Sequence, residues 1–219
     1  MKQTIVFALL AAIGLGASAC KLTGTGIAGS GVRKTEKRDL KSFNAIDTTG
    51  AYEIDVTCQK PASFEIEADD NILPLIKTEV RDGILFVSND QPYHSSKPVT
   101  LRMTLPELNS VSSHGAGQIN IADANSSDLK IESTGAASVV AAGAAKSVTI
   151  SSSGAGKIDT SNLRAEKARV DVNGAASVDV YASEQLDVNV SGVGHVSYSG
   201  NPKVVNKHVS GIGSVGPKD

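Results

Sequence analysis

The sequence is poor in the residues that would assign it to several common classes of protein. It has no Trp, aromatic residues make up 4%, and only 2 of its 219 residues are cysteines. So few cysteines exclude a disulfide-rich scaffold and a zinc site built from cysteines. A formal net charge of −2 argues against binding of nucleic acid, because phosphate-binding proteins carry a basic excess. Hydrophobic residues, at 40%, are too frequent for a disordered chain, and the length fits one domain or two small ones.

The beginning of the chain has the pattern of a secretory signal. Lys2 supplies a positive start, residues 5–15 form an apolar run, and residues 17–19 are the small residues of a cleavage site. The apolar run is shorter than the roughly 20 residues that a membrane-spanning helix needs. We therefore predict a signal peptide over residues 1–19 and export of the protein.

Cys20 follows the predicted cleavage site directly and allows two interpretations. In the first, residues 17–20 are a bacterial lipobox, and acyl chains on Cys20 anchor the protein in the membrane. In the second, ordinary signal peptidase leaves Cys20 unmodified as the first residue. A typical lipobox has Leu where this chain has Ala17, but a cysteine at the cleavage point of a cysteine-poor chain favours lipidation. The predicted location is the bacterial periplasm, the outer membrane or the cell surface.

The other cysteine, Cys58, is expected to be a small buried residue of a strand, and a Cys20–Cys58 disulfide is possible only without lipidation. Residues 20–38 are rich in Gly, Thr and Ser and end in a basic patch. This composition predicts a flexible tether, followed by a single domain over residues 39–219.

Internal repeats dominate the second half of the sequence. A short motif that starts with glycine and ends in Ile or Val recurs with spacings of 18 to 20 residues, with leading glycines at positions 115, 135, 154, 174, 192 and 211. A looser copy begins at Gly50. Four residues after each glycine stands Ile or Val, and four residues before it stands Ile or Val in every copy but the last, which has Lys207.

These columns predict a β-solenoid. Apolar residues alternate within each repeat, which is typical of strands with one buried face. A unit of about 19 residues buries its apolar face only by stacking on the next unit, so the strands of successive coils should pair in parallel. The glycine marks a bend, and the hydroxyl and amide residues before it are expected to form a ladder. An antiparallel sandwich is the alternative, but it predicts no fixed columns at this period.

Residues 55–107 depart from the repeat and are expected to form an elaborated N-terminal coil that caps the stack. Alternating apolar residues predict strands over 64–68 and 99–105, and an Asp-Asp-Asn sequence predicts a short helix over 72–76. Asp82-Gly83 predicts a hairpin turn between strands at 77–80 and 84–87.

Four segments resemble one bacterial family. They are residues 43–46, 49–54 and 66–76, together with the Ser-Gly-Ala-Gly-Lys-Ile run at 153–158. In these segments and in their order the chain is similar to the head GIN domain family, described as putative autotransporter adhesins, over roughly residues 38–217. The resemblance implies a right-handed parallel β-helix-like fold and an exported, often lipid-anchored protein. It brings no established activity and no catalytic residues.

One pair of carboxylates is a candidate for chemistry. Asp159 and Asp179 both stand five residues after a repeat glycine, so adjacent coils are expected to bring them about 5 Å apart. Such a pair suits a retaining glycosidase or a weak cation site. The simpler interpretation is an outward column of charges that keeps the surface soluble. The four histidines share no spacing and no Ser lies in a nucleophile elbow, so we predict no metal site, cofactor or catalytic residue.

The leading hypothesis is therefore an exported, lipid-tethered β-solenoid without enzymatic activity, of a binding or adhesion-like type. Its rows of Ser, Thr, Asn and Asp would face an envelope protein or a glycan, and no nucleic acid is expected as a partner. The alternative hypothesis is a carbohydrate-active enzyme, a polysaccharide hydrolase or lyase, that acts through Asp159 and Asp179.

Overall fold

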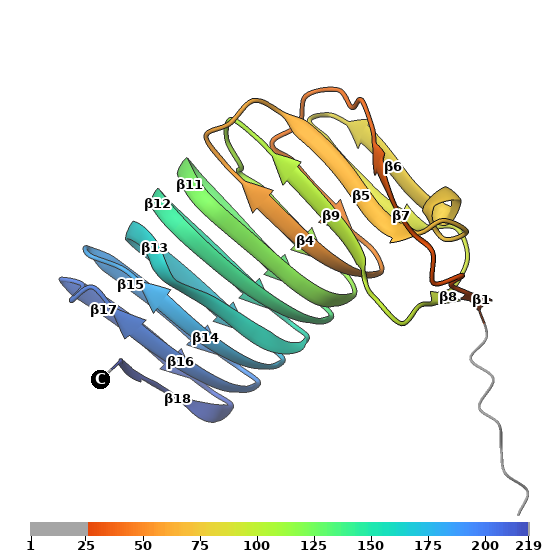
Figure 1. The fold of residues 1–219 in the computed structure, drawn as a ribbon. Helices are drawn as coiled ribbons and strands as arrows, with labels where there is room; N and C mark the ends of the chain where they lie inside the picture. The colour runs from red at the N-terminus through yellow and green to blue at the C-terminus, as the bar shows by residue number, and fades with distance from the viewer. Residues whose placement is uncertain (1–25, 219) are drawn as a thin grey trace, which may run out of the picture.

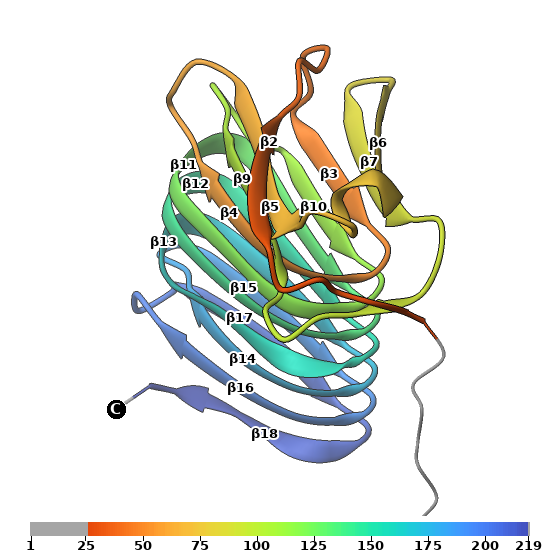
Figure 2. The ribbon, with the colours of Figure 1, turned by 45° about the vertical axis from the view of Figure 1, so that its right-hand side comes forward.

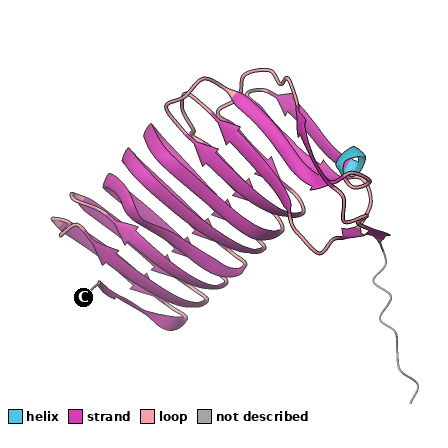
Figure 3. Cartoon of the chain, viewed as in Figure 1, coloured by secondary structure: helices cyan, strands magenta, loops and turns pink. Residues whose placement is uncertain are grey.

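The computed structural model describes residues 26–218, which form an elongated stack of coils built almost entirely of strands (Figures 1 and 3). Each coil has two flattened sides with apolar side chains between them. The strands of the regular coils are β3 (Ala45–Thr48), β4 (Ala51–Thr57), β10 (Ser110–Ser113), β11 (Ala116–Ser133), β12 (Ala136–Ser152), β13 (Ala155–Val172), β14 (Ala175–Tyr181), β15 (Gln185–Val190), β16 (Val193–Ser199), β17 (Val204–Val209) and β18 (Ile212–Pro217).

Successive coils pair in parallel, and the paired residues form the two columns that the sequence predicts. On one side of the stack the column consists of Ile46, Val111, Ile131, Ile150, Val170, Val188 and Lys207. On the other side it consists of Ile54, Ile119, Val139, Ile158, Val178, Val196 and Val215. All the Ile and Val residues in these columns are buried except Val215, which is partly buried. The solenoid prediction is confirmed, and the sandwich alternative is wrong.

The repeat glycines lie at one bend of each coil, where the backbones of neighbouring coils touch. A Cβ atom on Gly135 would lie 1.7 Å from the carbonyl oxygen of Gly115, and one on Gly154 would lie 1.8 Å from that of Gly135. No side chain fits at such distances, so the glycine is required for close approach. The predicted ladder is present beside this bend in two places. The His114 Nδ1 atom lies 2.9 Å from the Thr134 hydroxyl oxygen, and the Ser191 hydroxyl donates to Asn173 at 2.5 Å.

A second bend closes the coil on the opposite side. The register between β11 and β12 shifts between Ile121 and Ala124, and Asp123 there has a left-handed φ of 56°. In the next coil Gly143 has a φ of 133°, and a Cβ atom on it would lie 2.2 Å from the Ala124 carbonyl oxygen. In the later coils this bend separates two strands, β14 from β15 and β16 from β17.

The N-terminal end of the stack is elaborated as predicted (Figure 2). The added elements are β5 (Ser63–Asp69), the 3-10 helix η1 (Leu73–Leu75), β6 (Ile76–Arg81), β7 (Ile84–Asn89), β8 (Tyr93–His94) and β9 (Val99–Thr104). The β6–β7 hairpin and the strands β5 and β9 confirm the predicted elements, and the predicted helix is a single turn that begins near Pro74. Strands β7 and β9 pair in parallel with β3 and β4, so the insertion extends both sides of the stack.

The predicted flexible tether over residues 20–38 is wrong for the part that the structure describes. Residues 27–28 form β1 (Ile27–Ala28), which pairs with β8, and residues 33–37 form β2 (Arg33–Lys37), which pairs antiparallel with β5. Strand β2 thus covers an edge of β5, which would otherwise be open for pairing with another chain. The folded unit begins before residue 39. The predicted signal peptide and residues 20–25 lie outside the described residues.

The basic residues of β2 contact acidic residues of β5 and Asp70, which directly follows β5. The Arg33 guanidinium lies 3.3 Å from the Glu67 carboxylate and 3.7 Å from that of Asp69, whose side chain is 2% exposed. Lys34 and Lys37 pair with Asp70 and Glu65 at 3.6 and 3.1 Å. The exposed lysine pairs stabilise little, but the Arg33 guanidinium also donates to the carbonyl oxygens of Glu67 and Pro98, each at 3.0 Å, and so holds the segment in place.

The C-terminal end of the stack has no such cover among the described residues. Strands β17 and β18 each pair on one side only. Lys207 takes the place of a core valine in β17, and its ammonium group donates to the Val215 carbonyl oxygen at 3.3 Å. A charge that points into the end of a sheet discourages further strands from pairing there.

A substitution at a repeat glycine tests the close contact between neighbouring coils. Gly135→Ala places a methyl group against the Gly115 carbonyl oxygen and forces two coils apart. We expect it to lower the free energy of unfolding by about 3 kcal/mol or more, as measured by urea denaturation. Gly216→Ala is the matched control, because a Cβ atom there meets no atom within 4 Å. Equal stability of the two variants would contradict the packing argument.

Candidate functional site

One candidate functional surface is the outward side of the sheet that contains β4, β11, β12, β13, β14, β16 and β18. We call it the polar face. It consists of two columns of outward side chains, three and five residues after each repeat glycine. The first column is Glu53, Gln118, Ser138, Lys157, Ser177, His195 and Ser214. The second is Asp55, Asn120, Val140, Asp159, Asp179, Ser197 and Gly216.

Hydrogen bonds between coils hold parts of the polar face in place. The Asn120 amide donates to the Asp55 carboxylate of the preceding coil at 2.8 Å. The His195 ring contacts the Ser214 hydroxyl of the following coil at 2.6 Å and the Ser197 hydroxyl at 2.9 Å. His195 is thus a member of the surface network. Because the β-ladder and these bonds fix the spacing, the face presents polar groups at intervals of about 4.8 Å.

Asp159 and Asp179 are neighbours on this face, as predicted, because they pair directly between β13 and β14. The Lys157 ammonium group lies 3.8 Å and that of Lys218 3.6 Å from the Asp179 carboxylate. The Ser161 hydroxyl and backbone N–H donate to the Asp159 carboxylate at 2.6 and 3.1 Å. The two acids therefore belong to a cluster that also supplies their counter-charges.

The surroundings of Asp159 favour the ionised form of its own carboxyl group. Partial burial acts to raise its pKa, but the two hydrogen bonds from Ser161 and the charges of Lys218 and Lys157 together hold the pKa below its usual value. A retaining glycosidase needs one protonated carboxylic acid of raised pKa, and Asp159 does not fit that role. Lys157 and Lys218 already supply the positive charge that a cation bound at the two carboxylates would otherwise supply. Within residues 26–218 no group of three or more His, Cys, Asp or Glu side chains is arranged as metal ligands.

A groove at the second bend was missed by the sequence analysis. Its cavity measures about 460 Å³, and small residues of three successive coils, Ser126, Ala145 and Ala165, lie along it. The Arg164 guanidinium lies 4.4 Å from the centre of the Tyr181 ring at the same groove. The small residues recur ten or eleven residues after the repeat glycines, and that spacing is the signal that would have revealed the groove.

Of the two cysteines, Cys58 lies within the described residues and Cys20 does not. Cys58 is 1% exposed, as predicted, and burial, with a smaller effect of Asp123, raises its thiol pKa to about 11. A thiol of that pKa is a poor nucleophile at neutral pH. Cys20 lies outside the described residues, so its lipidation and a Cys20–Cys58 disulfide stay predictions. Across residues 26–218, no helix combines the length and apolar character needed to cross a bilayer.

The fold and the polar face define the class of protein, a parallel β-solenoid with regular rows of polar side chains on its outside. Residues 42–202 match the family described as putative auto-transporter adhesin, head GIN domain, and the chain belongs to this family. The predicted resemblance is confirmed. Among curated proteins none matches the chain.

Solved structures of similar proteins show the same fold. A putative adhesin from Bacteroides fragilis is 28% identical, with a TM-score of 0.73 over 88% of this chain and 100% of its own. A putative adhesin from Parabacteroides distasonis is 16% identical, with a TM-score of 0.67 over 88% of this chain and 100% of its own. A structure described as a putative lipid binding protein, also from Parabacteroides distasonis, is 18% identical, with a TM-score of 0.51 over 89% and 100%.

The cluster around Asp159 yields a prediction of pH dependence. Because the pKa of Asp159 is lower in the fold than its ordinary value, its ionised form stabilises the fold above that ordinary value. This contribution is lost as the pH falls through the lowered pKa. Ser161→Ala should raise the pKa of Asp159, as followed by NMR titration of the side-chain carboxyl carbon, whereas Ser177→Ala should leave it unchanged. A wild-type pKa above the usual value would contradict this account and favour an acid catalyst.

Proposed function

We propose that the protein is an exported, lipid-tethered binding protein of the bacterial cell surface, without enzymatic activity. The observation that carries the proposal is the polar face, a rigid array of regularly spaced hydrogen-bonding groups. An array of this kind is complementary to an extended partner with repeating polar groups, such as a glycan, or to a flat protein surface. The family description and the adhesin-like description of the Bacteroides fragilis structure support this role.

The position of the N-terminal segment supports the tether. Strand β1 lies at the elaborated end of the stack, opposite the end that carries β18 (Figure 1). Cys20 precedes Ile27 by seven residues, which span at most about 25 Å when fully extended. An anchor on Cys20 would hold the elaborated end near the membrane and leave the polar face accessible along the stack.

The test is the mass and the membrane partitioning of the protein from its native host. We expect Cys20 to carry acyl chains and the protein to partition into detergent, because several acyl chains anchor a protein stably. Cys20→Ala should give a protein without the acyl mass that stays in the aqueous phase. Cys58→Ala is the control and should partition like the wild type. A wild-type protein that begins at an unmodified Cys20 and stays in the aqueous phase would refute the tether.

A further inference from the structure

We propose that a cavity at the N-terminal end of the polar face binds a neutral pyranose unit of a glycan. The proposal rests on the function proposed above and deepens it by naming a site and a ligand class. The cavity, which we call the loop cavity, measures about 500 Å³ and forms where the segment that carries β8 lies against β4 and β11. Its lining includes Glu53, Tyr93, His94, Lys97, Gln118 and Ser138.

Tyr93 gives the loop cavity a fixed aromatic ring. Its backbone pairs with Ile27, and its phenol group donates a hydrogen bond to the Ala51 carbonyl oxygen at 3.3 Å. Part of the ring packs against the core, and this burial raises the pKa of the phenol, so the group is neutral. A ring held in this way loses little conformational freedom when a ligand stacks on it. Sugar rings have an apolar C–H face that stacks on such a surface.

The floor of the loop cavity supplies polar groups in a row. Glu53, Gln118 and Ser138 are directly paired residues of β4, β11 and β12, so a carboxylate, an amide and a hydroxyl follow one another at intervals of about 4.8 Å. Gln118 donates to Asn120 at 3.1 Å, and its carbonyl oxygen accepts no hydrogen bond from a described side chain. These groups are suited to pair with the hydroxyls on the rim of a sugar ring.

The charges of the loop cavity favour a neutral ligand. Glu53 and Lys97 both line the cavity, and neither forms an ion pair with any residue between 26 and 218. An anionic ligand would call for an excess of cations, which this lining does not have. A site with the held ring of Tyr93, one carboxylate, one ammonium group and several hydrogen-bonding groups matches an uncharged polyhydroxylated ligand.

Gly117 lets β11 approach β4 closely beneath the loop cavity. It has a φ of 130°, and a Cβ atom on it would lie 1.9 Å from the Tyr52 carbonyl oxygen.

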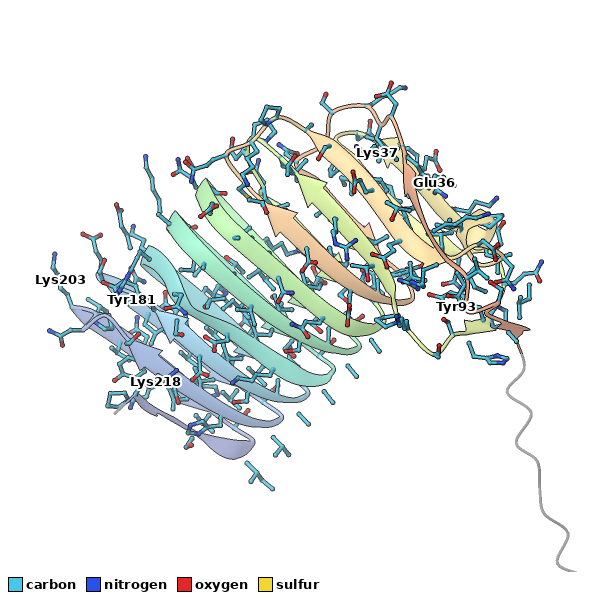
Figure 4. The ribbon with its side chains drawn as sticks, in the orientation of Figure 1. Glu36, Lys37, Tyr93, Tyr181, Lys203 and Lys218 are labelled. Carbon is cyan, nitrogen blue, oxygen red and sulfur yellow. The ribbon has the colours of Figure 1, made fainter. Side chains whose placement is uncertain are left out.

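The experiment uses the purified Cys20→Ala protein and a panel of neutral gluco-, manno- and galacto-oligosaccharides, with binding measured by calorimetry. We expect at least one member to bind. Tyr93→Ala should weaken that binding by about tenfold, and Gln118→Ala by about three- to tenfold. Tyr181→Ala and Gln185→Ala are the matched controls and should bind like the parent. Tyr181 lies far along the stack from Tyr93 (Figure 4), and Gln185 donates to Asp187 much as Gln118 donates to Asn120.

The outcomes separate this inference from the proposed function. Binding that both Tyr93→Ala and Gln118→Ala leave unchanged would overturn the loop cavity as the site, while the protein would still be a glycan-binding protein. Absence of binding at millimolar concentrations would overturn the sugar ligand and leave a protein partner for the polar face. If Tyr93→Ala fails to fold, Gln118→Ala decides alone, because that side chain is exposed on a central strand. Vesicles with and without a neutral glycolipid then distinguish a lipid headgroup from a free polysaccharide as the source of the sugar.

Discussion

The contact between the backbones of successive coils at the repeat glycines determines the rest of the structure. Because the glycine of one coil rests on the carbonyl group of the coil before it, each coil has one register relative to its neighbour. A shift of one residue would turn every core valine outward. The same register places Ile and Val over Ile and Val in both columns, except at Lys207, and leaves the polar residues between them on the outside.

The functional surfaces follow from that register together with the irregular N-terminal end. A stack of identical coils offers flat rows of side chains and few enclosed spaces. The polar face is of this kind, and its charges are largely satisfied by neighbours, as in the cluster of Asp159, Asp179 and their lysines. The loop cavity arises only where the β8 segment leaves the regular path and closes over the sheet. The regular coils form the floor of the loop cavity, and the inserted segment that carries β8 forms its side.

The features that repeat could be predicted from the sequence, whereas those that depend on single distant contacts could not. Alignment on the glycines predicts both core columns and the pairing of Asp159 with Asp179. The order of residues 27–37 was missed because it depends on pairing with β8 and β5, far along the chain, and no local pattern reports such pairs. The contact of Lys218 with Asp179 also joins residues far apart in the chain, so no local pattern predicts it either. Tyr93 stands in a polar loop without a repeat, so its sequence position does not show which groups lie beside it.

Native-state hydrogen exchange across the stack tests the central claim, that coil-to-coil pairing holds the fold, most directly. The account predicts that amides of β12 and β13, which pair on both sides, exchange slowest, and that those of β17 and β18, which pair on one side, exchange fastest. Protection of β17 and β18 equal to that of β12 would contradict the account, because the last coil lacks the second neighbour from which its stability would come.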